Sequence, residues 1–181
     1  LRSRGLGDVY KRQAYDAGAK GVMMFRWGLS NFIDFNKLNT HEITPSYGDS
    51  VSINSILAAS ASLKKYIEDK GVLPKFVTVG KSNYTVPQFL YLMTKATEGI
   101  ANGNLKEITA ILVNASSKTS GDVINKQLVK SEFVSLAKTL SSYMSANGIA
   151  PGNVSSTLGD IKYESLIYAY ARVLSYYQSN S

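Results

Sequence analysis

The sequence LKKYIEDKGVLP at residues 63–74 recurs without a gap, 77 positions later, as LSSYMSANGIAP at residues 140–151. The match continues downstream, where Val77 aligns with Val154 and Tyr91 with Tyr168. Self-similarity over about fifty residues is the signature of a structural unit that is present twice. Such duplicated units usually present one weak recognition surface several times. The chain is therefore first a candidate for a binding array.

The first part of each copy is predicted to be an amphipathic helix, because its apolar residues recur at steps of three and four. Ser50 and Ser131 are the expected N-caps, and Gly71 and Gly148 are the expected left-handed C-caps. The apolar stripes are Ile53, Ile56, Ala59, Leu63, Tyr66 and Ile67 in the first copy and Phe133, Leu136, Leu140, Tyr143 and Met144 in the second. Tyr66 and Tyr143 are thus expected in the core.

The second part of each copy is predicted to be a short extended segment followed by another helix. Residues 76–79 alternate briefly, Pro87 suits a first helical turn, and Asn102-Gly103 ends the helix. The apolar stripe is Phe89, Leu92, Met93, Ala96 and Ile100, matched by Leu166, Tyr170, Val173 and Tyr177 in a final helix over about 161–177. The fold class is mainly α, with two tandem helix–loop–short extended–helix repeats.

The two repeats are assigned to residues 50–104 and 131–181. Between them, residues 105–130 carry Ile108 to Val113 and then a run rich in Ser, Thr and Gly, which predicts an extended segment and spacer. Residues 39–49 are polar and contain a proline and a glycine, so they are expected to form a linker.

The residues before the linker fall into two parts. Residues 1–13 match the translation of a sequencing adapter and are interpreted as an artefactual leader. Residues 14–38 contain a glycine-bounded apolar run, which predicts one buried strand in the C-terminal remnant of a truncated α/β domain. With Arg26 and Trp27 this strand is similar to the last strand of a (β/α)8 glycoside hydrolase; the alternative is an ordinary core strand.

The composition argues against several classes of function. The leader accounts for +3 of the net charge of +7, and the remainder forms no basic stripe typical of nucleic-acid binding. The chain has no cysteine, and its single histidine, His41, has no second His nearby, so we expect neither a metal site nor a cofactor. No apolar run reaches the roughly 20 residues that span a bilayer.

The order of residues in both copies resembles the pseudomurein-binding repeat of methanogenic archaea. The resemblance rests on GVLP at 71–74 with YTVPQFLYL at 84–92, and on GIAP at 148–151 with YESLIY at 163–168. It covers roughly residues 56–104 and 131–181. It implies a cell-wall module that attaches noncovalently to pseudomurein, the glycan and peptide mesh of those organisms, and hence an extracellular location.

Four residues are candidates for contact with that polymer. On a helical wheel Tyr91 and Lys95 point away from the apolar stripe, and the repeat shift carries this pair to Tyr168 and Arg172. A tyrosine ring can stack on the apolar face of a sugar while the cation meets a carbonyl or carboxylate. The alternative for Tyr91 and Tyr168 is burial against the other repeat.

Three functions are compatible with these observations. The first is a cell-wall binding module that anchors an upstream domain to pseudomurein. The second is the C-terminal fragment of a wall-lysing glycoside hydrolase, with the catalytic residues upstream of this sequence. The third is a repeat that binds another protein.

Overall fold

The computed structural model describes residues 46–122, 124 and 126–180, all within a compact unit that begins at Glu42. The expected leader (1–13), the expected α/β remnant (14–38) and most of the expected linker (39–49) lie outside the described residues. Arg26, Trp27 and His41 are among the residues outside that range.

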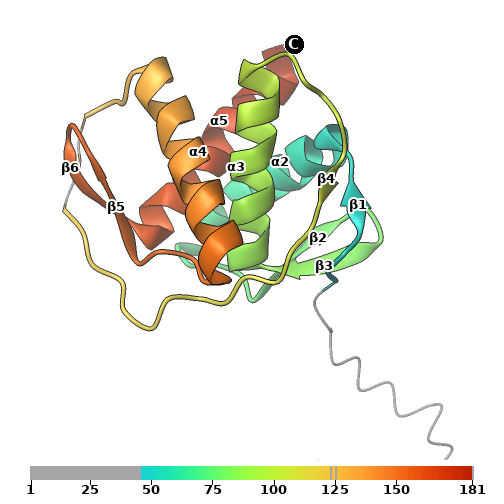
Figure 1. Ribbon diagram of the computed structural model, residues 1–181, viewed down its shortest axis with the longest axis horizontal. Coiled ribbons are helices and arrows are strands. Elements are labelled where there is room, and N and C mark those ends of the chain that lie inside the picture. Colours follow the sequence, from blue (N-terminus) through green and yellow to red (C-terminus); the bar gives the residue numbers. More distant parts are fainter. Residues whose placement is uncertain (1–45, 123, 125, 181) are drawn as a thin grey trace, which may run out of the picture. The chain divides into compact units, whose positions relative to one another are not determined.

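The two repeats have the same secondary structure at the same spacing, as the sequence predicted (Figure 1). Every element of the first repeat begins 77 residues before its counterpart in the second. The fold is therefore mainly α, with a helix, a hairpin and a helix in each copy. The first repeat contains α2 (Ile53–Lys70), β2 (Phe76–Val79), β3 (Ser82–Thr85) and α3 (Val86–Ala101), and the second contains α4 (Lys130–Asn147), β5 (Asn153–Ser156), β6 (Gly159–Lys162) and α5 (Tyr163–Asn180).

The extended piece of each repeat is an antiparallel hairpin rather than a single segment. Phe76 pairs with Thr85 in the first hairpin, and Asn153 pairs with Lys162 in the second, so the register is also repeated. The second strand of each hairpin was not predicted, because four mostly polar residues give almost no period-two signal. The hairpin places the second helix directly after β3 and β6.

The predicted C-caps are confirmed. Gly71 and Gly148 have φ values of 70° and 64°, in the left-handed region. Their N–H groups donate to the carbonyl oxygens of Ile67 (2.8 Å) and Met144 (2.9 Å), four residues earlier. Each glycine thus ends its helix and turns the chain toward the hairpin.

The predicted N-caps are wrong. Ser52, not Ser50, caps α2, and its hydroxyl accepts a hydrogen bond from the N–H of Ser55 (3.2 Å). Ser50 instead lies in β1 (Ser50–Val51), which pairs with β4 (Ile108–Thr109). In α4 the N-cap is Val129, without a side-chain cap, and Ser131 lies inside the first turn. Pairing with a distant strand, which the local sequence does not reveal, shifts the start of α2.

The helices of one repeat pack mainly on the helices of the other. The largest helix–helix interfaces join α2 to α5 and α3 to α4, whereas helices within one repeat contact each other much less. When the two repeats are exchanged, the α2–α5 interface takes the place of the α3–α4 interface. The second helices of the two repeats, α3 and α5, also contact each other. The unit therefore has approximate two-fold symmetry and a single core that both repeats build.

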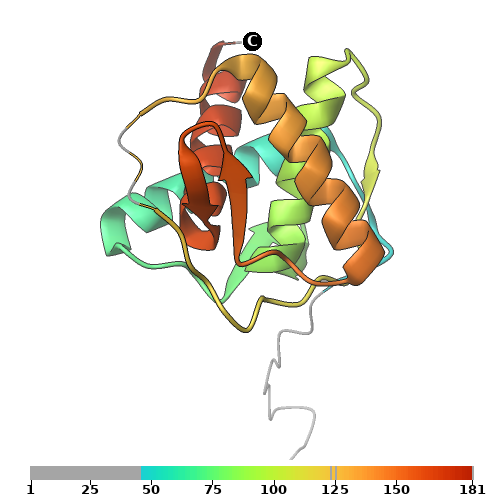
Figure 2. The same ribbon diagram turned by 60° about the vertical axis from the view of Figure 1, so that its left-hand side comes forward.

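The most deeply buried helix is α3. Figures 1 and 2 show it beside α4, and it also contacts α2 and α5. Eleven consecutive or nearly consecutive residues of α3, from Val86 to Thr97, are buried. A helix covered on several sides must be apolar around most of its circumference. Despite this, no helix in the described part of the chain is both long and apolar enough to cross a membrane.

The segment between the repeats follows the surface of the unit and is attached to it at three places (Figure 2). It meets the start of the first repeat, then the end of α4, then β6. Gln88, which is buried in α3, also donates from Nε2 to the carbonyl oxygens of Ser46 (3.0 Å) and Ile111 (3.2 Å). The attaching backbone hydrogen bonds are Ala110 N to Asp49 O (2.9 Å), Asn114 N to Gly148 O (2.8 Å) and Asp122 N to Asp160 O (2.7 Å).

Replacing either cap glycine by alanine should destabilise the unit by a similar amount. A Cβ in the left-handed conformation costs about 1–2 kcal/mol, and the two caps have nearly the same φ. We expect Gly71→Ala and Gly148→Ala each to lower the free energy of unfolding by that amount in urea denaturation. Ser145→Ala, at an exposed position within α4, is the control and should change little. Unchanged stability in both glycine variants would contradict the assigned caps.

Candidate functional site

The structure does not place Tyr91 on an outward face. Its side chain lies in α3 and is only 8% exposed. The helical wheel assumed one buried stripe, but α3 is covered by several helices, so the position opposite the stripe is also buried. The unbroken apolar run at 89–93 is the sequence signal for this. The burial of Tyr91 agrees with the alternative stated for it above.

Lys95 lies at the edge of the interface between α3 and α4. Its Nζ is 3.4 Å from Oε2 of Glu98, and its side chain is 37% exposed. The other carboxylate oxygen of Glu98 accepts a hydrogen bond from the hydroxyl of Ser141 in α4 (2.5 Å). Lys95 therefore belongs to a polar network that joins the two repeats while part of its side chain remains accessible.

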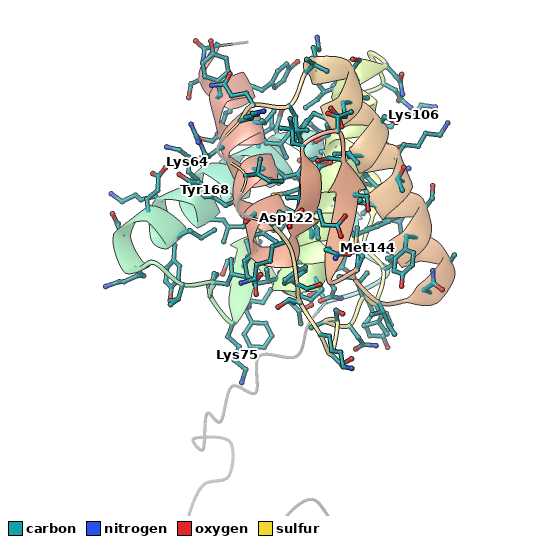
Figure 3. The ribbon with its side chains drawn as sticks, turned by 90° about the vertical axis from the view of Figure 1, so that its left-hand side faces the viewer. Lys64, Lys75, Lys106, Asp122, Met144 and Tyr168 are labelled. Carbon is teal, nitrogen blue, oxygen red and sulfur yellow. The ribbon has the colours of Figure 1, made fainter. Side chains whose placement is uncertain are left out.

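Tyr168 and Arg172 form the expected pair on α5, and both are accessible. The Arg172 guanidinium lies 5.5 Å from the centroid of the Tyr168 ring, a cation–π contact. The hydroxyl of Tyr168 donates to Oε1 of Glu68 in α2 (2.8 Å), and Lys64 Nζ lies 3.2 Å from Oε2 of the same carboxylate. Figure 3 shows Tyr168 and Lys64 on the same side of the unit. This cluster spans the interface between α2 and α5.

The contacts within this cluster shift two pKa values in opposite directions. The hydrogen bond from Tyr168, followed by the contact with Lys64, lowers the pKa of Glu68 below its ordinary value of 4.5. The same hydrogen bond is the main cause that raises the pKa of Tyr168 above 10.0. The two groups thus hold each other in the protonation states that the hydrogen bond needs.

The two predicted pairs occupy equivalent places in the two-fold arrangement but have different surroundings. Lys95 is connected to α4 through Glu98 and Ser141, and Tyr168, beside Arg172, is connected to α2 through Glu68. One tyrosine is buried and the other is partly exposed. Contact of Lys95, Tyr168 and Arg172 with a ligand stays a prediction.

Tyr66 and Tyr143 were expected in the core, and the structure shows that this is wrong. Their exposed fractions are 40% and 45%. Consecutive helical residues point about 100° apart, so the burial of Met144 turns its neighbour Tyr143 toward the edge of the stripe. The same holds for Tyr66 beside the partly buried Ile67. The periodic pattern could not separate the edge of the stripe from its centre.

Each exposed tyrosine has an exposed aliphatic residue at the same helix end. Val72 directly follows the cap Gly71 and is 58% exposed, and its counterpart Ile149 is 43% exposed. We call Tyr66 with Val72, and Tyr143 with Ile149, the two helix-end patches. They are equivalent under the repeat shift. Figures 2 and 3 show the C-terminal ends of α2 and α4 on opposite sides of the unit.

Comparison of the chain with protein-family models, curated proteins and solved structures found no match.

Replacing Tyr168 by Phe should make the free energy of unfolding depend less on pH in the acidic range. Because Glu68 has a lowered pKa in the folded state, its contribution is present above about pH 4.5 and is lost as the pH falls through the folded-state pKa. Tyr168→Phe removes the main cause of the shift. We expect the free energy of unfolding, measured by urea denaturation from neutral pH to about pH 3, to fall less steeply in the variant.

Tyr176→Phe is the matched control, since Tyr176 is a 71% exposed tyrosine on the same helix. Its free energy of unfolding should change with pH in the same way as that of the unmodified chain. Equal acid slopes for Tyr168→Phe and the unmodified chain would rule out a role for the hydrogen bond to Glu68.

Proposed function

We propose that this chain is a noncovalent cell-wall binding module that attaches to pseudomurein outside the cell and anchors an upstream domain there. Two lines of support meet in this proposal. One is the resemblance of both repeats to the pseudomurein-binding repeat. The other, which carries the proposal, is the pair of equivalent helix-end patches with their exposed tyrosines at Tyr66 and Tyr143.

The side chains of the patches suit a glycan and peptide polymer. A partly exposed tyrosine ring offers an apolar face for a sugar ring and a hydroxyl for hydrogen bonding. Val72 and Ile149 add aliphatic surface beside the chain turn at Gly71 and Gly148. Such a small patch contributes about 1 kcal/mol beyond area burial, which gives weak binding by itself.

Two equivalent weak patches on one rigid body make attachment effective. Once one patch is bound, the second binds intramolecularly, at a high effective concentration. The shared core fixes the separation of the patches, because α2 and α4 each pack on a helix of the other repeat. A mesh, which presents the same chemical unit in many places, is the kind of ligand that uses this arrangement.

The proposal is tested by sedimentation of the full chain with purified methanogen cell walls. Tyr66→Ala and Tyr143→Ala should each weaken binding by roughly fivefold, from the loss of about 1 kcal/mol. The double variant should lose more than either single variant, because the intramolecular second contact is lost. Both positions are exposed, so circular dichroism should show the same helix content and similar melting.

Tyr176→Ala is the control for the loss of an exposed aromatic ring. Tyr176 is on α5 and has Gly99 as its counterpart in the first repeat, so it belongs to no repeated patch. It should sediment with the walls like the unmodified chain. Undiminished binding of the double tyrosine variant would refute the role of the patches, and an unmodified chain that stays in the supernatant would refute the function itself.

A further inference from the structure

A groove of about 520 Å³ lies in the first repeat, beside the start of α2. Its walls come from β1, from the turn of the β2–β3 hairpin and from the residue before β4. Figure 1 shows these elements next to one another. The groove contains none of the four residues predicted from the sequence and neither helix-end patch.

Two carboxylates line the groove, and each is held by one of its two oxygens. Oδ2 of Asp49 accepts hydrogen bonds from the hydroxyls of Ser82 (3.2 Å) and Tyr84 (3.4 Å). Oε2 of Glu107 accepts from the hydroxyl of Ser50 (2.5 Å). Within the described residues, Asp49 Oδ1 and Glu107 Oε1 have no hydrogen-bond partner. The carboxylates are therefore oriented by the protein and retain acceptor capacity for a ligand.

In the second repeat a side chain bridges the helix and the turn that correspond to two walls of the groove. Glu132 in the first turn of α4 accepts hydrogen bonds from the N–H (2.7 Å) and hydroxyl (2.8 Å) of Thr157 in the β5–β6 turn. The repeat shift converts Glu132 to Ser55 and Thr157 to Gly80, and both of these residues line the groove. Their side chains are too short to bridge the helix and the turn, so the first repeat has no such bridge across its groove.

The charges of the groove select the kind of ligand. The charged residues that line the groove are Asp49, Glu107 and Lys81, which gives its lining a formal net charge of −1, so an anionic group is disfavoured. Charged carboxylate acceptors and serine hydroxyls are suited to hydroxyl donors. Tyr84 is 1% exposed and offers no ring face, so the recognition is polar rather than by stacking.

We infer that this groove is a subsite for one neutral, hydroxyl-bearing sugar unit of the wall glycan, bound through the free oxygens of Asp49 and Glu107. The inference rests on the proposed function and extends it: the first repeat holds a sugar edge by hydrogen bonds, in addition to the contacts at the helix-end patches.

The test is nitrogen–proton NMR of the full chain, titrated with soluble, peptide-free glycan fragments prepared from methanogen walls. We expect amide shifts concentrated at Ser50, Lys81 and Ser82, and a separate set near Tyr66 and Tyr143. Glu107→Ala should weaken the groove response at least tenfold and leave the patch response unchanged. Lys106→Ala, an exposed neighbour of Glu107 that does not line the groove, is the matched control and should bind normally.

A second variant copies the bridge found in the second repeat. Ser55→Glu places a carboxylate at the position equivalent to Glu132, where it can accept from the N–H of Gly80 as Glu132 does from that of Thr157. A carboxylate in the first turn of α2 also interacts favourably with the helix dipole. The variant should therefore be at least as stable as the unmodified chain. We expect it to abolish the groove shifts while patch binding persists.

The outcomes separate the subsite from the proposed function. Glycan shifts that avoid the groove, or that survive in Ser55→Glu, would overturn the subsite while sedimentation with walls continues to support the function. If the unmodified chain does not sediment with walls, the proposed function is rejected. The sugar site in the groove is then tested separately, by NMR titration with a neutral chito-oligosaccharide. Shifts at the groove with that probe, lost in Ser55→Glu, would retain the sugar site, and no shifts would reject it.

Discussion

Cross-packing between the repeats is the constraint on which the rest of this structure depends. The first helix of each repeat buries its apolar stripe against the second helix of the other, at α2–α5 and α3–α4. Each buried aliphatic or aromatic side chain contributes about 1.5–3 kcal/mol, and the largest helix–helix interfaces join helices of different repeats. The two repeats therefore build one shared core, to which the hairpins also contribute buried residues such as Val77, Tyr84 and Ile161.

The same constraint explains why equivalent residues have different environments. The two-fold arrangement makes the backbones alike but does not require the side chains to match. Gln88 connects α3 to the segment between the repeats, whereas its counterpart Ser165 is exposed. Glu132 accepts hydrogen bonds from Thr157 in the β5–β6 turn, whereas its counterpart Ser55 lines the groove. Both repeats thus keep the same framework of helices and hairpins. A difference at a single position gives one repeat a structural contact and leaves the equivalent position of the other repeat available for a ligand.

The proposed attachment uses the regions of the fold that cross-packing leaves exposed. The ends of α2 and α4 carry the helix-end patches, and the β1–β4 pair with the first hairpin forms the groove. Rigid presentation reduces the conformational entropy lost on binding, so weak contacts can add up. The cluster of Tyr168, Arg172, Glu68 and Lys64 also joins α2 to α5 through its internal contacts, and contact of Tyr168 and Arg172 with a ligand stays a prediction.

The sequence by itself determined the repeat, its spacing of 77 residues, the mainly helical class and the glycine caps at Gly71 and Gly148. These depend on local periodicity and on backbone conformations that only certain residues adopt easily. The tertiary structure alone decided which tyrosines are buried. Tyr91 is covered because α3 has neighbours on several sides, and Tyr66 and Tyr143 are exposed because they lie at the edges of their stripes. Helical periodicity gives the direction of a side chain about its own axis, but only the arrangement of the neighbouring helices determines what lies in that direction.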